Sequence, residues 1–396
     1  MSRTERTYYL IVGSYNLSWA FVGAVYTIFL LDAGLDLFEI NLVLATFFIA
    51  SFLFEVPTGA VADLLGRKVS FVGSCIVRAG AFWLYFEADG LVDFLIAEAV
   101  DAVGQTLASG ALDAWAVDGT GREKQPPGAD RLLSRGYMVS HIAMLMSGLA
   151  GGYLGQQNLR IPWIAGTISF VVTGIIAIVW MRERWVPAEI SGPPVRGGLV
   201  GHQVSRGLAT VRSAPILRVL FTITAAAGFA QMPVLHYWPP YIQAVSGKGA
   251  WLLGWVWAFL IVLSIIASWL VPRLVARWGR GRVAAGAALL RGTSVLLAAT
   301  AGRFAPGLGG LAGHSVGMSI GIPVVDAWVN DHVAERERAT VLSISSMAFM
   351  FGGASGLIVL GLVARAGGIG VAWICSAVIY CGCALAYAAI VRAEEP

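Results

Sequence analysis

Twelve long apolar stretches leave this chain very few ways to fold. A helix that crosses the apolar core of a bilayer needs about 20 residues of this kind, and the helix satisfies its own backbone hydrogen bonds where water is absent. Only 13% of the 396 residues are charged, against about 25% in soluble domains. The stretches are 8–31, 37–62, 69–86, 91–117, 133–155, 161–181, 215–245, 251–274, 283–301, 306–329, 340–364 and 370–391. We therefore predict an all-α membrane protein with twelve transmembrane helices.

The connections between these stretches indicate how the chain is organised. Lys and Arg accumulate in cytoplasmic loops, and here most lie on the side of the N-terminus. The loops on the opposite side hold only Arg160, Lys248, Arg303 and Arg365. Both termini are therefore predicted to be cytoplasmic. The domains expected are an N-terminal six-helix bundle over 1–181, a Pro- and Gly-rich cytoplasmic linker over 182–214 that includes a surface helix near 202–212, and a C-terminal six-helix bundle over 215–396.

An internal repeat relates the two predicted bundles. Three separate features recur at one offset, which for the Asp-Ala-Trp sequence is 326 − 113 = 213 residues. Repeats in the same orientation, related by an axis along the membrane normal, are one design found in secondary transporters. The matched pairs are 112–118 with 325–331, Gly66-Arg67 with Gly279-Arg280, and Arg78 with Arg291.

The segment from Gly59 to Lys68 resembles the major facilitator superfamily. It matches the signature G-x-x-x-D-x-x-G-R-[KR] of that family in the loop after the second span, through Gly59, Asp63, Gly66, Arg67 and Lys68. With twelve spans and a repeat, the resemblance covers essentially the whole chain. It implies the family's fold of two pseudo-symmetric bundles, and it implies transport by alternating access rather than enzymatic activity.

Charges at the ends of the predicted helices are expected to act in gating. Arg67 and Asp118 fall on the same face of the membrane and form a predicted pair, and the repeat predicts a second pair between Arg280 and Asp331. Asp63 has no counterpart, because Ala276 stands at its position. Asp113 and Asp326 lie about a turn and a half deeper in their spans. For these two aspartates we favour a role in gating over contact with the substrate. The simpler alternative, charges that only set topology, fits Lys68 and most of the other loop arginines.

Ionisable groups in the membrane interior are costly and are therefore candidates for function. Arg78 and Asp101 lie at similar depth on neighbouring antiparallel spans and are predicted partners, with Glu98 one turn from Asp101. A carboxyl group here that gains and loses a proton would couple transport to the proton gradient, whereas a static ion pair would only fix packing. Asp101 ranks ahead of Glu98 as the carrier. Glu55 and His141 are further candidates.

The second bundle differs at the position of Asp101, where the repeat places His314. Arg291 thus lacks an acid of matching depth, and it could meet an anionic substrate or an acid from the other bundle. Aromatic and amide side chains on the first and seventh spans suit amphipathic organic molecules. The residues expected to line the substrate cavity are Asn16, Trp19, Tyr26, Gln231, Tyr237, Arg291 and His314.

The family resemblance allows two functions. A Gly-rich run over 147–155 resembles the antiporter motif of the family's exporters, although that motif's proline is absent. The favoured function is proton-coupled efflux of small amphipathic organic compounds, and the alternative is a proton-coupled symporter importing a nutrient or anionic metabolite. We expect a small-molecule substrate, protons and the lipid bilayer as partners, no nucleic acid, no cofactor, no metal, and a monomer in the cell (plasma) membrane.

Overall fold

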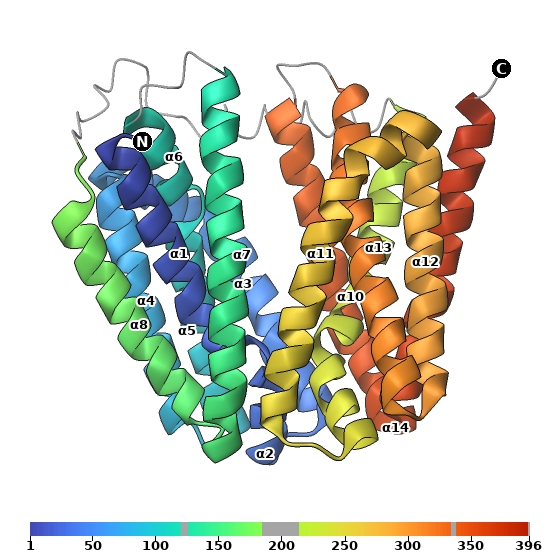
Figure 1. Ribbon diagram of the computed structural model, residues 1–396, viewed down its shortest axis with the longest axis horizontal. Coiled ribbons are helices and arrows are strands. Elements are labelled where there is room, and N and C mark those ends of the chain that lie inside the picture. Colours follow the sequence, from blue (N-terminus) through green and yellow to red (C-terminus); the bar gives the residue numbers. More distant parts are fainter. Residues whose placement is uncertain (120–125, 184–213, 334–337, 395–396) are drawn as a thin grey trace. The chain divides into compact units, whose positions relative to one another are not determined.

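The computed structural model describes residues 1–119, 126–183, 214–333 and 338–394, and its regular elements there are all helices (Figure 1). Almost the whole predicted linker, residues 184–213, lies outside the described residues together with its expected surface helix. The first eight helices are α1 (Arg3–Gly23), α2 (Tyr26–Asp32), α3 (Leu37–Leu65), α4 (Arg67–Glu87), α5 (Leu91–Ala108), α6 (Ala111–Gly119), α7 (Pro126–Gln157) and α8 (Ile161–Trp180). The remaining ones are α10 (Pro215–Ser246), α11 (Ala250–Trp278), α12 (Arg280–Ala301), α13 (Phe304–Asp331) and α14 (Arg338–Glu394).

The predicted spans correspond to these helices, with three local differences. The first span is bent by 41° between α1 and α2. The span predicted over 91–117 is divided into α5 and α6, because Gly110 has a φ of +69° that ends the helix. Conversely, α14 holds the last two predicted spans, separated at Gly368, whose φ of +81° is not helical.

Helix length and hydropathy alone identify fewer membrane-spanning helices than the twelve that the sequence predicts. In the described ranges, nine helices are long and apolar enough to cross a membrane, or up to ten if α1 and α2 form one bent span. The long helix α14 counts once there although it holds two predicted spans. The helix α5 contains three acids, Asp93, Glu98 and Asp101, in its 18 residues, and acids lower the hydropathy of a segment. Two of these three acids, Glu98 and Asp101, are also the candidates for proton coupling.

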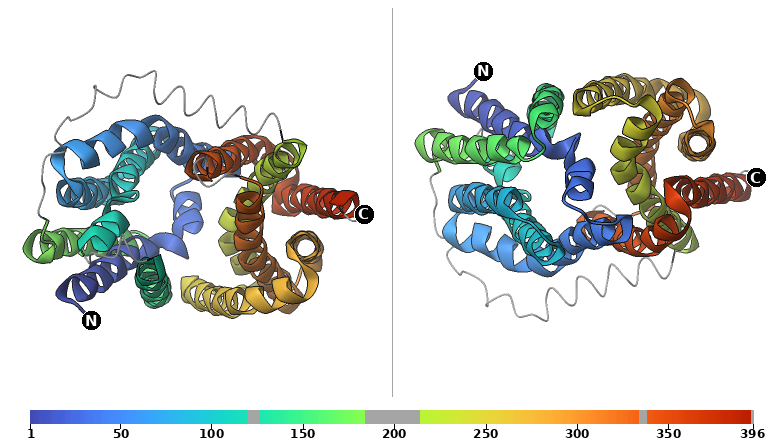
Figure 2. Two further views of the ribbon diagram at one scale, coloured as in Figure 1. Left: turned by 90° about the horizontal axis from the view of Figure 1, so that it is seen from above. Right: turned by 90° about the horizontal axis from the view of Figure 1, so that it is seen from below.

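The structure separates into two compact units, each described here by itself. Unit 1 comprises Met1–Glu189 with Lys248–Ala258, and unit 2 comprises Ile190–Gly247 with Phe259–Pro396. In unit 1, α1 packs against α7 and α8, and α4 packs against α5 and α8. In unit 2, α10 packs against α14, and α12 packs against α13 and α14. Figure 2 shows most of the helices in each unit nearly end-on, as expected for helices that cross one layer together. The domain boundaries set out above stay a prediction.

Glycines allow the closest helix contacts in both units. A Cβ built on Gly151 of α7 would lie 1.8 Å from the carbonyl oxygen of Phe21 on α1. In unit 2, a Cβ on Gly352 of α14 would lie 2.0 Å from the carbonyl oxygen of Ala225 on α10. Small residues let the backbones of membrane helices approach in this way. The Gly-rich run of α7 therefore has a packing role, whatever else it does.

Replacing Gly151 with alanine is expected to destabilise unit 1. The added methyl group cannot share space with a backbone carbonyl, so the two helices must move apart, and overpacking of this kind costs about 1–3 kcal/mol. The measurement is the thermal midpoint of the purified protein, followed by tryptophan fluorescence. The matched control is Gly80→Ala, because a Cβ at Gly80 meets no atom within 4 Å. Equal midpoints for the two variants would contradict the packing role of Gly151.

Candidate functional site

A buried ion pair joins α4 to α5 in unit 1. Arg78 donates from Nε to Asp101 Oδ1 at 2.8 Å and from its NH2 group to Asp101 Oδ2 at 2.9 Å. The two residues are only 5% and 8% exposed. The structure thus brings together the two partners that the sequence predicted. Two parallel hydrogen bonds between guanidinium and carboxylate fix both side chains in one geometry.

Further contacts of Arg78 were not foreseen from the sequence. Its NH1 group donates to Gln105 Oε1 at 2.8 Å and to the Tyr15 hydroxyl at 3.1 Å. Gly104 makes room for the arginine, because a Cβ there would lie 2.5 Å from Arg78 Cγ. Gln105 is four residues beyond Asp101 and therefore on the same helix face, which is the signal that could have found it. Each of the three guanidinium nitrogens therefore donates a hydrogen bond, and the partners are an acid, an amide and a phenol.

Glu98 lies among hydroxyl groups rather than cations. The Tyr26 hydroxyl donates to Glu98 Oε2 at 2.8 Å, and the Tyr85 hydroxyl donates to the same oxygen. The two hydroxyls are 2.7 Å apart, and the ring of Tyr85 is stacked on that of Trp163. Glu98 is 7% exposed and has no ion-pair partner in the described part of the chain. Sequence reasoning missed Tyr85, although it is seven residues after Arg78 and so near the same face of α4.

Arg291 of α12 occupies the repeat position of Arg78 but has different partners. Its NH2 group donates to Gln231 Oε1 of α10 at 2.8 Å and to the hydroxyl of Tyr380 of α14. Its guanidinium carbon lies 4.0 Å from the ring centroid of Tyr380. Arg291 is 6% exposed, its Nε has no hydrogen-bond partner, and no acid pairs with it in the described residues. Within the described residues, only neutral groups contact this buried cation.

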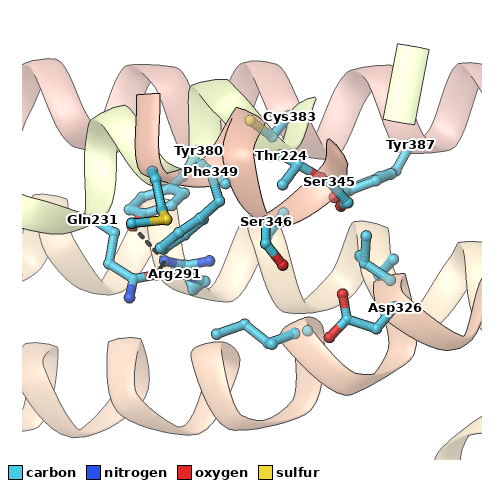
Figure 3. Close-up of a pocket in the computed structure, with 17 residues that line it drawn as sticks. Thr224, Gln231, Arg291, Asp326, Ser345, Ser346, Phe349, Tyr380, Cys383 and Tyr387 are labelled. Carbon is cyan, nitrogen blue, oxygen red and sulfur yellow. Dashed lines mark hydrogen bonds between the residues drawn. The ribbon is translucent and has the colours of Figure 1, made fainter. Parts of the chain in front are cut away.

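A cavity of about 270 Å³ lies inside unit 2 beside this arginine (Figure 3). Its lining includes Gln231, Arg291, Asp326, Ser346 and Phe349. Figure 3 shows Arg291 and Asp326 toward different ends of the set of lining residues, with Ser346 between them. Of the residues predicted to line a substrate cavity, Gln231 and Arg291 do so. His314 is not among the lining residues. Its ring lies 5.5 Å from that of Tyr380, and its Nδ1 has no hydrogen-bond partner in the described residues.

The two pairs predicted at the helix ends are both present. Arg67 forms an ion pair with Asp118 in unit 1, and Arg280 forms one with Asp331 in unit 2. Each arginine follows a glycine with positive φ, +97° at Gly66 and +74° at Gly279. Other residues adopt such a conformation only under strain. The glycine therefore turns the chain sharply, so that the next helix begins with its arginine beside the acid.

Glu183 completes this corner and was not identified from the sequence. Its two carboxylate oxygens accept hydrogen bonds from the backbone N–H groups of Arg67 and Lys68, each at 2.9 Å. The first N–H groups of a helix lack partners within the helix, and a carboxylate there also interacts favourably with the helix dipole. Lys68 Nζ donates to the carbonyl oxygen of Ile178 at 2.7 Å. The start of α4 is thus fastened to the end of α8.

The other gating candidates have separate environments. Gly59 and Asp63 are exposed on the last turns of α3, and Asp63 has no polar partner within the described ranges. Asp113 accepts a hydrogen bond from the Tyr8 hydroxyl at 2.7 Å. Its repeat counterpart Asp326 lines the unit 2 cavity instead, with no ion pair in the part of the chain that the structure describes. The two copies therefore use this aspartate differently.

The remaining candidates mostly make local contacts. Glu55 is exposed and accepts from the Ser109 hydroxyl at 2.9 Å, and His141 Nδ1 lies 2.9 Å from the carbonyl oxygen of Tyr137 on its own helix. Asn16 joins α1 to α7 through Ser140, with Nδ2 to Oγ at 3.0 Å, and accepts from Trp19 Nε1 at 3.1 Å. Tyr237 is fully buried and is not part of the unit 2 cavity lining.

Comparison with known proteins gives the family. The family model described as Major Facilitator Superfamily matches residues 8–310. The uncharacterized MFS-type transporter YxaM of Bacillus subtilis (strain 168) is 21% identical over 374 residues, covering 92% of this chain and 90% of that protein. The nucleoside transporter NupG has a similar structure, with a TM-score of 0.81 at 14% identity over 99% of this chain and all of that one. The human organic anion transporter MFSD10 has a TM-score of 0.68 at 14% identity over 97% and 99%. This protein is therefore a multi-pass transporter of the alternating-access type, not an enzyme, and belongs to the major facilitator superfamily.

Proposed function

We propose that this protein exports small amphipathic organic compounds in exchange for protons, as a monomer in the plasma membrane with both termini cytoplasmic. The observation that carries the proton coupling is the environment of Glu98. This carboxyl group is buried, and its described partners are two phenolic hydroxyls. Burying an ionised carboxylate without a cation is costly, and such a group inside a membrane protein is a candidate for a proton relay.

Glu98 replaces Asp101 as the first candidate for the proton carrier. Asp101 holds the guanidinium of Arg78 through two hydrogen bonds. Its protonation would leave a buried arginine unpaired, and breaking a buried pair costs about 3–5 kcal/mol. Protonation of Glu98 breaks no ion pair that the structure describes. The proton therefore binds and leaves Glu98 at lower cost, while Arg78 and Asp101 hold α4 and α5 in place around it.

The substrate class is inferred from the side chains that line the cavity of unit 2. The similar structures are named for nucleosides and for organic anions, so the shared fold leaves the substrate open. Here the cavity of unit 2 combines apolar and aromatic side chains with a few polar groups, which is the usual composition of a site for organic ligands. This supports an amphipathic organic substrate.

The second candidate function is proton-coupled uptake of a nutrient or anionic metabolite. Arg291 favours it, because this buried arginine lines a cavity and forms no ion pair with an acid in the described residues, so it can attract an anion. The Gly-rich run of α7 favours export through its resemblance to the antiporter motif, and its packing against α1 is compatible with either direction. Direction of transport is therefore the property to measure.

The test uses proteoliposomes with an imposed pH gradient and a panel of fluorescent amphiphiles and aromatic carboxylates. A proton-coupled exporter accumulates substrate on the acidic side of the membrane, because protons leave that side as substrate enters it. A symporter accumulates substrate on the opposite, alkaline side. A protonophore should abolish either gradient. Equal distribution of every compound in the panel, with or without the gradient, would reject proton coupling and efflux together.

A further inference from the structure

The cavity of unit 2 has a cation at one end and an acid at the other. Arg291 is 6% exposed and lines the cavity, and its described contacts are to neutral groups. The equivalent Arg78 of unit 1 is neutralised by Asp101, whereas His314 stands at the corresponding position in unit 2. One copy of the repeat thus supplies its own counter-ion, and the other leaves its arginine open to the cavity.

We infer that this cavity binds the single anionic group of a small organic acid, with the carboxylate at Arg291 and the rest of the molecule directed away from it. This inference rests on the proposed function and names its substrate class. Both hydrogen bonds of the Arg291 side chain within the described residues come from its NH2 group. Nε is buried there without a partner, and the NH1 group, which is not buried in this way, remains a donor for a ligand oxygen. Guanidinium and carboxylate form the short, charge-assisted bonds that fix a ligand in one orientation.

The rest of the lining limits the form of the acid. Phe349 and the ring of Tyr380 give the cavity aromatic surface, and Ser345, Ser346 and Thr224 add hydroxyls that carry no charge. The volume of about 270 Å³ is slightly below the range of about 300–1,000 Å³ typical of ligand pockets. An organic acid with about one aromatic ring and a short side chain fits a cavity of this volume.

Asp326 restricts the charge that the other end of the ligand can carry. It lines the same cavity, and it has no ion-pair partner in the residues that the structure covers. Like charges brought together in a site of low polarity repel strongly. A second carboxylate directed toward Asp326 would therefore weaken binding. The geometry selects a monoanion over a dianion of similar shape.

The test is binding to the purified protein in nanodiscs without any gradient, measured by calorimetry. Three probes share one body: 3-phenylpropionate, its neutral amide, and 3-(4-carboxyphenyl)propionate, which carries the second carboxylate. We expect the amide to bind at least about tenfold more weakly than the monoanion, since one charge-assisted contact is lost. The dianion should also bind more weakly than the monoanion.

The variants assign these preferences to residues. Arg291→Gln should remove the preference for the acid over the amide, and Asp326→Asn should bring the dianion close to the monoanion. Ser346→Asp, which places an internal carboxylate in the cavity, should abolish binding of the monoanion and serves if the arginine variant does not fold. Arg303→Gln, at an exposed arginine of the same unit, is the matched control and should bind like the wild type.

The inference is overturned if acid and amide bind alike, including absence of binding by both, or if Arg291→Gln keeps the preference. It is also overturned if the dianion binds more tightly than the monoanion. Because no proton gradient is present, binding of the acid can persist although proton coupling fails. Conversely, proton-driven transport of neutral amphiphiles without binding of the acid would refute this inference alone.

Discussion

Replacing Glu98 with glutamine is expected to abolish proton-driven accumulation of substrate while exchange of substrate across the membrane continues. Glutamine has nearly the same shape and still accepts a hydrogen bond at its carbonyl oxygen, so Tyr26 and Tyr85 keep a partner. It cannot bind or release a proton in the working range of pH. The protein should therefore still alternate between its states and carry substrate down a gradient, but no longer concentrate it.

The measurement compares two assays in the same proteoliposomes. One follows accumulation driven by a pH gradient, and the other follows exchange of labelled for unlabelled substrate at equal pH. Asp93→Asn is the matched control, since Asp93 is an exposed acid in the first turn of the same helix. It should keep both activities. A Glu98→Gln protein that still accumulates substrate would exclude this residue as the proton carrier.

Asp101→Asn should fail in a different way. It leaves Arg78 buried without its carboxylate, and a loss of about 3–5 kcal/mol is expected for breaking such a pair. We therefore expect a lower thermal midpoint and less folded protein, with coupling preserved in the molecules that fold. The opposite pattern, a stable Asp101→Asn protein that exchanges but does not accumulate, would return the role of carrier to Asp101.

The parts of the site that could be predicted are those fixed by depth or by the repeat. Arg78 and Asp101 lie at equal depth on antiparallel neighbours, and an ion in lipid needs a partner, so their pairing follows from the sequence. The pair between Arg67 and Asp118 follows from their positions at span ends on the same face of the membrane. Its copy between Arg280 and Asp331 followed from the offset of 213 residues (280 − 67).

The parts that could not be predicted depend on rotation of helices and on contacts far apart in the sequence. Glu183 caps α4 from a position 116 residues away, and no local sequence pattern predicts this contact. The hydroxyl of Tyr85 reaches Glu98 only because α4 and α5 face each other in one of several possible rotations. The break at Gly110 was missed because a glycine inside an apolar run is tolerated in membrane helices. It is the positive φ, not the residue type, that divides the span.

A membrane potential alone should concentrate the organic acid on its positive side, by about a hundredfold for each 59 mV. Inward movement of one proton and outward movement of one monoanion transfer charge in the same direction, so each cycle moves two charges. One charge is worth about 2.3 kcal/mol per 100 mV, and a factor of ten corresponds to about 1.4 kcal/mol. Export of an anion in exchange for a proton is therefore strongly favoured by a negative cell interior.

The measurement imposes a potassium diffusion potential with valinomycin at equal pH and follows the distribution of 3-phenylpropionate. Symport of one proton with one monoanion transfers no net charge, so its distribution would not respond to voltage. Transport of the anion without a proton would give a tenfold ratio for each 59 mV. The slope thus separates exchange, symport and uncoupled transport. In Glu98→Gln, which moves substrate without protons, the hundredfold slope should be absent. A voltage-independent distribution in the wild-type protein would contradict export and indicate uptake by symport. Arg291 would then accept its anion together with the proton that neutralises it.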